Sequence, residues 1–419
     1  MQRICKGVLA IGVTFISVLI LNFNLFNVLP KSDFESYNSD SQQLVFDSIH
    51  QPNFPVDGFG LGSYSSESNS VIPYKSNVGA QGYFFYFANQ IGCSSENCLH
   101  IFNATLFGLT FALLIMLLYR DTSKWLAFVV LFTIWGSPWI TIFARNVYWI
   151  PFSWFLPLVV VLLLFGSKKP IVKSVGLRYL ILGSVFTFKF LAGYEFVSSV
   201  ILLAGVAPFL KLYQEQNSTD KKIKHAQIQA LKIVMTAFGA LGLAILIHAY
   251  LRGTSIIAGL ESIVLDVKRR THGNSQDFPG TYADSLDASS SEVLRKYFFE
   301  WNTPVLNFGT PEFAKVTLGQ NLFLLLIISC VLTGVIAYAF MGNERKFNVR
   351  LHDSGIFLFF YALSIPLSWF ILASAHSYIH THINFVLWYL LTIPVLIWIS
   401  GKNVISIFKF VSHRMKVVA

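Results

Sequence analysis

Three histidines stand close together near the C-terminal end of the chain, at His376, His380 and His382. A spacing of four places the first two on one helical face, where imidazole nitrogens can bind a divalent metal. The sequence puts no carboxylate beside them, so we expect these histidines to donate hydrogen bonds to an anion such as pyrophosphate. A divalent metal stays the alternative, and no cofactor is indicated.

Further polar residues border the apolar runs of the sequence, where burial in hydrocarbon would be costly. They are Arg145, Asn146, Lys189 and Glu195 at the ends of apolar runs, Tyr74, Lys75 and Gln81 in a glycine-containing stretch, and the pair Arg269 and Arg270. Arginine binds phosphate in a bidentate way and lysine binds it as a point charge. One phosphate-bearing lipid substrate would explain the set. The alternatives are scattered contacts with membrane lipids and a Lys189 that extends to the headgroups.

Three carboxylates follow the first apolar run, at Asp33, Glu35 and Asp40. An enzyme that acts on a lipid-linked substrate needs a carboxylate held near the membrane surface, where it can deprotonate an acceptor hydroxyl as a general base. Because these residues follow the apolar run after only a few positions, their carboxylates would lie near the membrane surface. The alternative is a solvated polar loop in which none of the three has a chemical role.

The composition decides which kind of protein must position these residues. Hydrophobic residues make up 54% of the 419 positions and charged residues only 12%, whereas soluble domains carry about 25% charged residues. Forty phenylalanines would leave large apolar patches on a soluble fold. We therefore exclude a soluble enzyme, a nucleic-acid-binding domain and a disordered protein, and expect an all-α polytopic membrane protein in one domain, residues 1–419.

Apolar runs long enough for a bilayer core predict about ten transmembrane helices. The predicted runs are 7–29, 99–119, 125–144, 147–165, 175–193, 196–213, 229–250, 320–341, 355–375 and 383–400. With both termini inside, the short inner segments hold most of the lysines and arginines, and the outer segments hold most of the acidic residues. The net charge of +10 then indicates topology and contact with anionic lipids, and needs no nucleic-acid partner.

Two segments, 30–98 and 251–319, are too long to be simple connectors, and both are predicted to face outward. Residues 40–49 and 292–301 are amphipathic and are predicted to form interfacial helices. The stretches 58–70 and 284–291 are rich in glycine and serine, and we expect them to be mobile. Cys93 and Cys98 would form a disulfide in an oxidising compartment, joining the end of the first segment to the second helix.

This arrangement resembles the GT-C class of membrane glycosyltransferases, which use polyprenyl-phosphate sugars as donors. The resemblance implies a catalytic acid in the first long segment, for which Asp40 and the Asp33–Glu35 pair are the nearest matches. It also implies a direct displacement in which Asp40 deprotonates the acceptor hydroxyl while lysine and arginine hold the leaving phosphate. The expected setting is the outer face of a bacterial inner membrane. The chain shows neither a P-loop nor a Rossmann fingerprint, so no nucleotide site is expected.

Three other functions compete with this one. A surface-polysaccharide polymerase also has many helices, two outward segments and an arginine followed eleven residues later by glycine, a spacing that Arg269 and Gly280 share. A lipid or glycolipid flippase should carry polar residues at mid-depth in broken helices, and the sequence places no charge there. A membrane scaffold without catalysis is the third.

Overall fold

The computed structural model describes residues 2–28, 30–166, 171–215, 219–278, 283–300, 306–308, 315–316, 322–341 and 350–418. In this part of the chain the fold is almost entirely helical, and its strands form two short antiparallel ribbons, β1–β2 and β3(Leu306–Asn307)–β4(Lys315–Val316). Gly280, on which the polymerase spacing depends, lies outside the described residues.

Six of the described helices are long and apolar enough to cross a membrane. They are α5(Glu96–Asp121), α9(Val175–Ala192), the α10–α11 unit Val197–Gln214, α12(Asp220–Arg252), Ser354–Leu372 within α17(Arg350–Leu372), and Thr392–Met415 within α20(Thr392–Val418). The pair α6(Lys124–Trp135) and α7(Pro138–Ala144) becomes a seventh if its two bent halves form one span. Ten crossings stay a prediction.

Other predicted runs appear as shorter apolar helices in the described part of the chain. They are Gly7–Asn22 in α1(Gln2–Asn22), α8(Phe152–Phe165), and Leu326–Ala337 in α16(Leu322–Met341). The predicted run 147–165 begins too early, because residues 145–150 form a turn and α8 starts only after Pro151. The predicted run 383–400 is also displaced, since α19(Thr381–Asn384) and the 3₁₀ turn Phe385–Tyr389 precede α20.

Serine and threonine residues set the starts of most long helices. Ser95, Ser174 and Thr219 each accept a hydrogen bond from a backbone N–H in the first turn of α5, α9 and α12. The bend of 70° between α6 and α7 follows from Gly136 and from Pro138 at the start of α7. The ring of Phe308 fills the space that a side chain at Gly136 would need.

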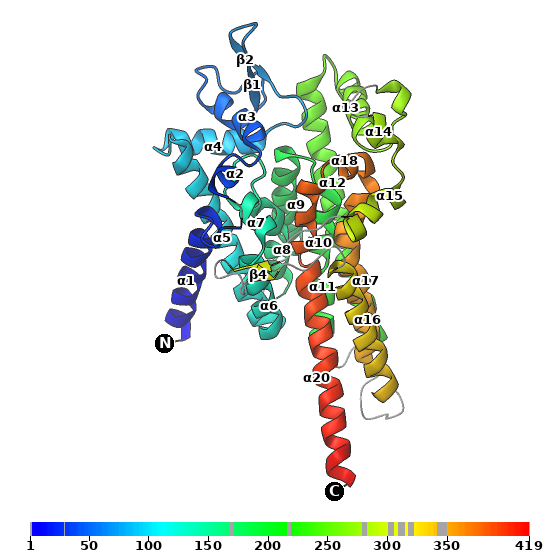
Figure 1. The fold of residues 1–419 in the computed structure, drawn as a ribbon. Helices are drawn as coiled ribbons and strands as arrows, with labels where there is room; N and C mark the ends of the chain where they lie inside the picture. The colour runs from blue at the N-terminus through cyan, green and yellow to red at the C-terminus, as the bar shows by residue number, and fades with distance from the viewer. Residues whose placement is uncertain are drawn as a thin grey trace.

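The two long segments meet at one end of the helices, opposite the two chain termini (Figure 1). The first contains α2(Lys31–Glu35), α3(Ser39–Ile49), the hairpin β1(Gly62–Ser65)–β2(Ser70–Pro73) and α4(Ala80–Gln90); the second contains α13(Ile256–Arg270), α14(Ala283–Asp287) and α15(Ser290–Arg295). The stretch 58–70 is therefore largely ordered, because its hairpin pairs Gly62 with Pro73 and the side chain of Asp47 accepts the N–H of Tyr64 at 2.9 Å. We call this end of the molecule the loop end.

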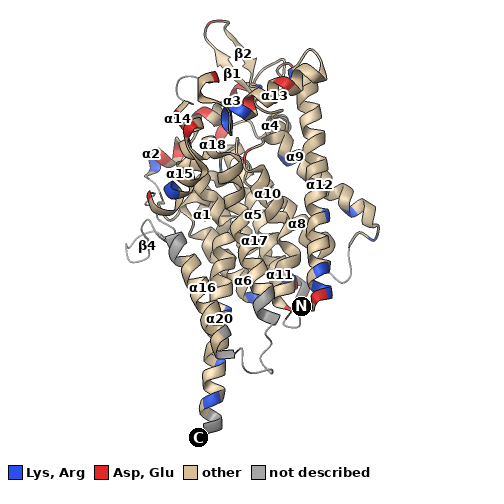
Figure 2. Cartoon of the chain, turned by 90° about the vertical axis from the view of Figure 1, so that its right-hand side faces the viewer, with Lys and Arg blue, Asp and Glu red and all other residues tan. Residues whose placement is uncertain are grey.

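Charges are distributed unevenly along the helix axis. Asp and Glu gather at the loop end around α2, α3 and α14, while Lys and Arg mark the far ends of α12 and α20 (Figure 2). Cys93, which follows α4, and Cys98, in the first turn of α5, form a disulfide whose Cα atoms lie 5.4 Å apart.

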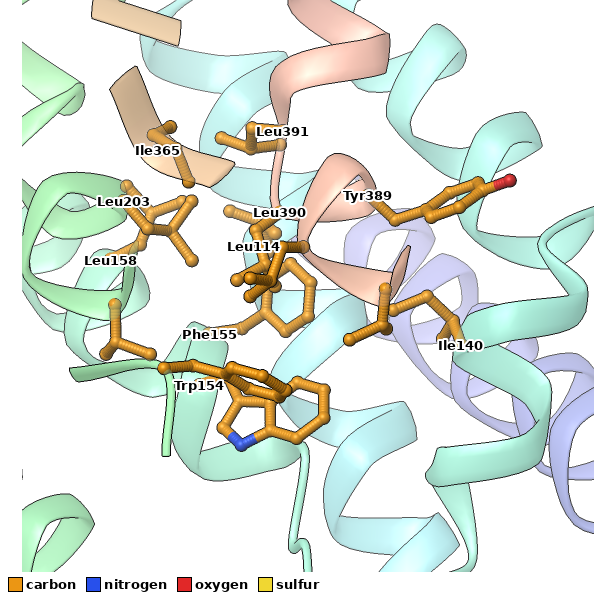
Figure 3. Packing of buried hydrophobic residues seen from close by; sticks show 14 of the residues in the cluster. Leu114, Ile140, Trp154, Phe155, Leu158, Leu203, Ile365, Tyr389, Leu390 and Leu391 are labelled. Carbon is orange, nitrogen blue, oxygen red and sulfur yellow. The ribbon is translucent and has the colours of Figure 1, made fainter. Parts of the chain in front are cut away.

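The core lies between helices that are far apart in the sequence. Leu114 of α5, Phe155 of α8 and Leu203 of α10 are fully or almost fully buried, and they pack around Ile365 and the segment Tyr389–Leu391 (Figure 3). Apolar side chains thus fill the middle of the helical body, and the buried polar groups described next lie toward the loop end.

Candidate functional site

A cavity of about 150 Å³ lies at the loop end, where α13, α18(Ser374–Ile379) and two short turns meet the first long segment. It is lined by Ser41, Tyr74, Tyr148, Trp149, Glu195, Arg269, Arg270, Ala375, His376, Ile379, His380 and Ile383. Six of the predicted site residues are brought together here from positions 74 to 380. Tyr148, Trp149 and Ser41 join them and were not among the predictions.

Arg270 supplies positive charge to the cavity and joins the two long segments. Its Nη2 donates a hydrogen bond to the Ser76 hydroxyl at 3.0 Å. Burial alone lowers the pKa of Arg270, but Tyr74 and Glu195 outweigh burial, and the pKa of this guanidinium is raised. Arg270 therefore stays a cation at any working pH and suits an anionic group.

Arg269 belongs to a network of charges that fixes the same junction. Asp266 binds Arg269 at 2.9 Å and Arg252 at 2.6 Å. Arg252 and His248 both donate to the carbonyl of Lys75, at 3.0 and 3.1 Å. The side chain of Lys75 is exposed and does not line the cavity, so this residue contributes its backbone rather than the charge that the sequence predicted.

The histidines form a row beside Arg270. The ring centroids of His376 and His380 lie 4.6 Å apart, and those of His380 and His382 lie 5.6 Å apart. Burial, reinforced by neighbouring His382 and Arg270, lowers the pKa of His380 to about 4, and burial also lowers the pKa of His376. Both imidazoles are therefore neutral near pH 7. His382 is exposed and instead accepts, through its carbonyl, the hydroxyl of Tyr37 at 2.9 Å.

No group of three or more His, Cys, Asp or Glu is arranged to hold a metal ion within the described part of the chain. His376 and His380 lie near the guanidinium of Arg270, whose positive charge disfavours protonation of both imidazoles.

The turn of residues 145–150, which we call the aromatic turn, carries Tyr148 and Trp149 to the cavity. The side-chain oxygen of Asn146 accepts the backbone N–H groups of Tyr148 and Trp149, at 2.9 and 3.1 Å. Ile150 ends the turn with φ of 37°, a conformation that is strained for a β-branched residue. Asn146, predicted to bind substrate, thus positions the two aromatic residues.

Buried side chains from two other helices, α4 and α5, hold the backbone of the aromatic turn. Asn103 donates to the carbonyls of Ala144 and Asn146, at 3.2 and 2.9 Å. His100 donates to the carbonyl of Arg145 at 3.0 Å, and Gln81 donates to that of Tyr148 at 3.2 Å. Gln81 is fully buried and does not line the cavity. Such dense bonding can maintain the strain at the end of the turn.

Glu195 stands in a second short turn, which follows α9. The ammonium of Lys189 donates to the carbonyls of Gly193 and Glu195, at 2.9 and 3.3 Å, and Lys189 is only 3% exposed. A side chain at Gly193 would collide with the Glu195 carboxylate. The hydroxyl of Tyr148 donates to Glu195 Oε1 at 3.4 Å, so the two turns meet at this carboxylate.

The carboxylates predicted to be catalytic lie elsewhere at the loop end. Asp33, Glu35 and Asp40 are all exposed, and none lines the cavity. Ser41, the neighbour of Asp40, does line it. Arg145 lies outside the cavity too: its guanidinium sits 5.3 Å from the ring centroid of Phe34, and burial lowers its pKa although Glu35 opposes the shift.

The cavity therefore combines one carboxylate, two arginines and two neutral imidazoles. Glu195 is the carboxylate that lines it, among the residues described. Tyr148 and Trp149 were missed because aromatic residues inside an apolar run usually pack in a core. The signal that could have found them is Asn146, a residue that caps turns, placed just before them and followed by Pro151.

Comparisons of this chain with protein-family models, with curated proteins and with solved structures found no match.

Proposed function

We propose that this protein is an integral membrane glycosyltransferase that moves a sugar from a polyprenyl-phosphate donor to an acceptor hydroxyl. The observation that carries the proposal is the cavity at the loop end, where Arg270, Glu195 and the neutral pair His376 and His380 converge at one end of a bundle of apolar helices. A lipid-linked phosphate has its charged group at the membrane surface and its chain in hydrocarbon, which suits this placement.

Glu195 acts as the general base in this mechanism. Its carboxylate takes the proton from the acceptor hydroxyl, and the oxygen attacks the anomeric carbon of the donor sugar. The bond from that carbon to the phosphate oxygen breaks, and the phosphate leaves with the electron pair. Arg270 offsets the charge that develops on the leaving phosphate, and the N–H groups of His376 and His380 donate hydrogen bonds to it.

Glu195 replaces Asp40 as the proposed base because of its position. Asp40 is exposed in the first turn of α3, where water surrounds its carboxylate and no cationic group of the cavity is in contact with it. Glu195 shares a wall with Arg270 and accepts a hydrogen bond from Tyr148. A base must lie within hydrogen-bond reach of the reacting hydroxyl, so the cavity favours Glu195.

The proposed setting is a bacterial inner membrane, crossed about ten times, with both termini inside and the loop end outside. The Lys and Arg residues at the far ends of α12 and α20, opposite the Asp and Glu gathered at the loop end, support this orientation, since basic residues collect on the inner side of membrane proteins (Figure 2). The lysines on the far ends of α12 and α20 then face anionic lipids.

Two substitutions test the proposal in proteoliposomes supplied with polyprenyl-phosphate sugars and an acceptor glycan fraction. Glu195→Gln is expected to lower the transfer rate by about 10²–10⁴-fold, which is the usual contribution of a general base. Asp40→Asn is the matched control and should change the rate less than about twofold. Full activity of Glu195→Gln together with loss in Asp40→Asn would return the role to Asp40. Full activity of both variants would overturn a carboxylate base altogether.

A further inference from the structure

Helix α4, at the loop end (Figure 1), is fixed at both of its ends to long apolar helices. Just before α4, the backbone N–H of Gly79 donates to the carbonyl of Leu191, in the last turn of α9, at 3.0 Å. Just after α4, the disulfide between Cys93 and Cys98 joins the chain to the first turn of α5. Both α5 and α9 are long and apolar enough to cross a membrane. Helix α4 therefore runs between the ends of two such helices, where a membrane surface would lie.

One side of α4 packs onto the ends of three helices through a single ring. The ring of Phe84 stacks on Phe102, in the second turn of α5, with centroids 5.6 Å apart. It also lies 5.9 Å from the ring of Phe152, the first residue of α8, and 6.3 Å from that of Phe188, in the last turn of α9. Phe84 thus places α4 directly over these helix ends.

Two further sides of α4 are covered by the protein itself. Gln81 is fully buried and donates to the carbonyl of Tyr148, so the first turn of α4 holds the aromatic turn. On another side, the ring of Tyr86 stacks on that of Phe54, with centroids 4.2 Å apart. Contacts with the protein therefore fix both the position of α4 and its rotation about its own axis.

The side of α4 that remains exposed is apolar. Phe87 is 65% exposed, Ile91 is 66% exposed and Tyr83 is 38% exposed. A spacing of four places these residues in one row, which we call the α4 stripe. Helix α4 contains no Asp, Glu, Lys or Arg. Aromatic and aliphatic side chains on one face of an uncharged helix are suited to the boundary between lipid and water.

Helix α3, which the sequence predicted to be interfacial, offers no comparable surface. Its apolar residues Val45 and Phe46 are buried in the protein, and its exposed positions include Asp40 and Gln43. The two neighbouring helices of the first long segment thus differ in what they turn outward, since α3 presents polar groups and α4 presents rings and an aliphatic side chain.

We propose that α4 docks on the membrane by inserting the α4 stripe into the lipid leaflet on the side of the loop end. Lipid surrounds helices that cross a membrane, and α4 lies on the ends of α5 and α9, so the stripe continues the surface that lipid covers. Because Gln81 of the same helix holds the aromatic turn, this docking sets the depth of the cavity relative to the headgroups. The inference goes beyond the proposed function and does not depend on the reaction.

Spin labels on the full-length protein in liposomes test the inference. Cys5→Ser and Cys330→Ala leave only the disulfide-bonded cysteines, and Phe87→Cys or Ile91→Cys then carries a nitroxide. At both positions we expect frequent collisions with oxygen, which dissolves in lipid, and loss of collisions with a water-soluble nickel complex. Tyr64→Cys is the matched control, because Tyr64 is 54% exposed on the nearby hairpin, and its label should show the reverse pattern.

Two results would overturn the inference. Labels at Phe87→Cys and Ile91→Cys that meet the nickel complex as often as the label at Tyr64→Cys would place the stripe in water. Labels protected from both reagents would show that protein, such as a second copy of this chain, covers it.

A second measurement uses the unaltered protein and so does not depend on folding of the variants. A carbene probe that partitions into lipid should label the chain at Phe87 and Ile91 and leave the hairpin at Tyr64 unlabelled. Equal labelling of both regions, or none at the α4 stripe, would contradict the inference. Neither measurement involves glycosyl transfer, so a failure of the proposed function would be seen separately.

Discussion

The short turns and the long segments at the loop end differ in how tightly they are built. The aromatic turn is buried, held by polar side chains of α4 and α5, and ends in a strained isoleucine. In the long segments, Asp33, Glu35 and Asp40 stand on short helices with their side chains in solvent. The two long segments therefore cover the cavity, and the short turns form its most rigid walls.

The same contrast separates two kinds of carboxylate. The buried Lys189 holds the backbone of the turn that carries Glu195, and Tyr148 donates a hydrogen bond to its carboxylate. Glu35 forms a solvent-exposed ion pair with Lys31 at 3.8 Å, and such pairs contribute little to stability. A group that must act at one geometry needs neighbours that cannot move, and in the described residues the short turns provide them.

Of the three effects that bear on this comparison, the largest is expected from removing Arg270, one of the two arginines that line the cavity. Arg270→Gln should lower glycosyl transfer by about 10²-fold, because a charge-assisted contact to the leaving phosphate disappears. The measurement is the transfer rate in proteoliposomes. Lys268→Gln removes the same charge from an exposed site on the same helical turn and should leave the rate unchanged. Equal losses in both variants would show that only general surface charge matters.

The next effect concerns the rigidity of the aromatic turn. Asn146→Ala leaves the buried N–H groups of Tyr148 and Trp149 without acceptors, so the free energy of unfolding should fall by about 1–3 kcal/mol. Denaturant unfolding in detergent measures it. Gln43→Ala, at an exposed position of α3, should stay within about 0.5 kcal/mol of the parent. Equal stability of the two variants would contradict the conclusion that the short turns are held more rigidly than the long segments.

The smallest effect is a pH dependence of stability. The pKa of His380 is about 4 in the folded protein because burial disfavours the imidazolium, and it is about 6.5 in an unfolded chain. Between these values the unfolded chain binds the proton and the folded protein does not. The free energy of unfolding should therefore fall as the pH drops from 6.5 toward 4, by on the order of 1 kcal/mol for this partly exposed group.

Unfolding at pH 7.5 and pH 4.5 checks this expectation. His380→Asn should flatten the dependence, while His225→Asn, at an exposed position of α12, should not. Identical slopes in the parent and in His380→Asn would contradict the assignment of a neutral, buried imidazole to the cavity.

Apolar runs predicted the long helices well where nothing interrupts them. The runs 99–119, 175–193 and 229–250 correspond to α5, α9 and α12. The run 383–400 begins too early, because Phe385–Leu390 are fully buried in the protein and Leu391, with φ of 70°, separates them from α20, whose span is Thr392–Met415. The hydrophobicity of a run indicates that its side chains avoid water, but it does not indicate whether lipid or protein covers them.

The site was predicted in part. Arg270, Glu195 and His380 were found because charged and imidazole groups stand out against apolar sequence. Asp40 was preferred to Glu195 because it follows the first apolar run closely. In the sequence, that closeness was the only indication of how near a carboxylate lies to the membrane surface. The sequence does not show which face of α3 turns toward the cavity, and Asp40 and Ser41 point to different surroundings. Trp149 could not be distinguished from the chain's other tryptophans, because the sequence does not show which of them lines the cavity.

The hydrogen bonds from His248, Arg252 and Arg270 to residues 75 and 76 bear on how the protein is made. Translation delivers the first wall of the cavity long before the arginines, and the histidines arrive last of all. Until His248, Arg252 and Arg270 have been made, residues 74–76 lack the hydrogen-bond donors that later hold them. The cavity can therefore form only after residues 376–383 have been made, and a chain cut short before residue 376 would lack the histidine wall.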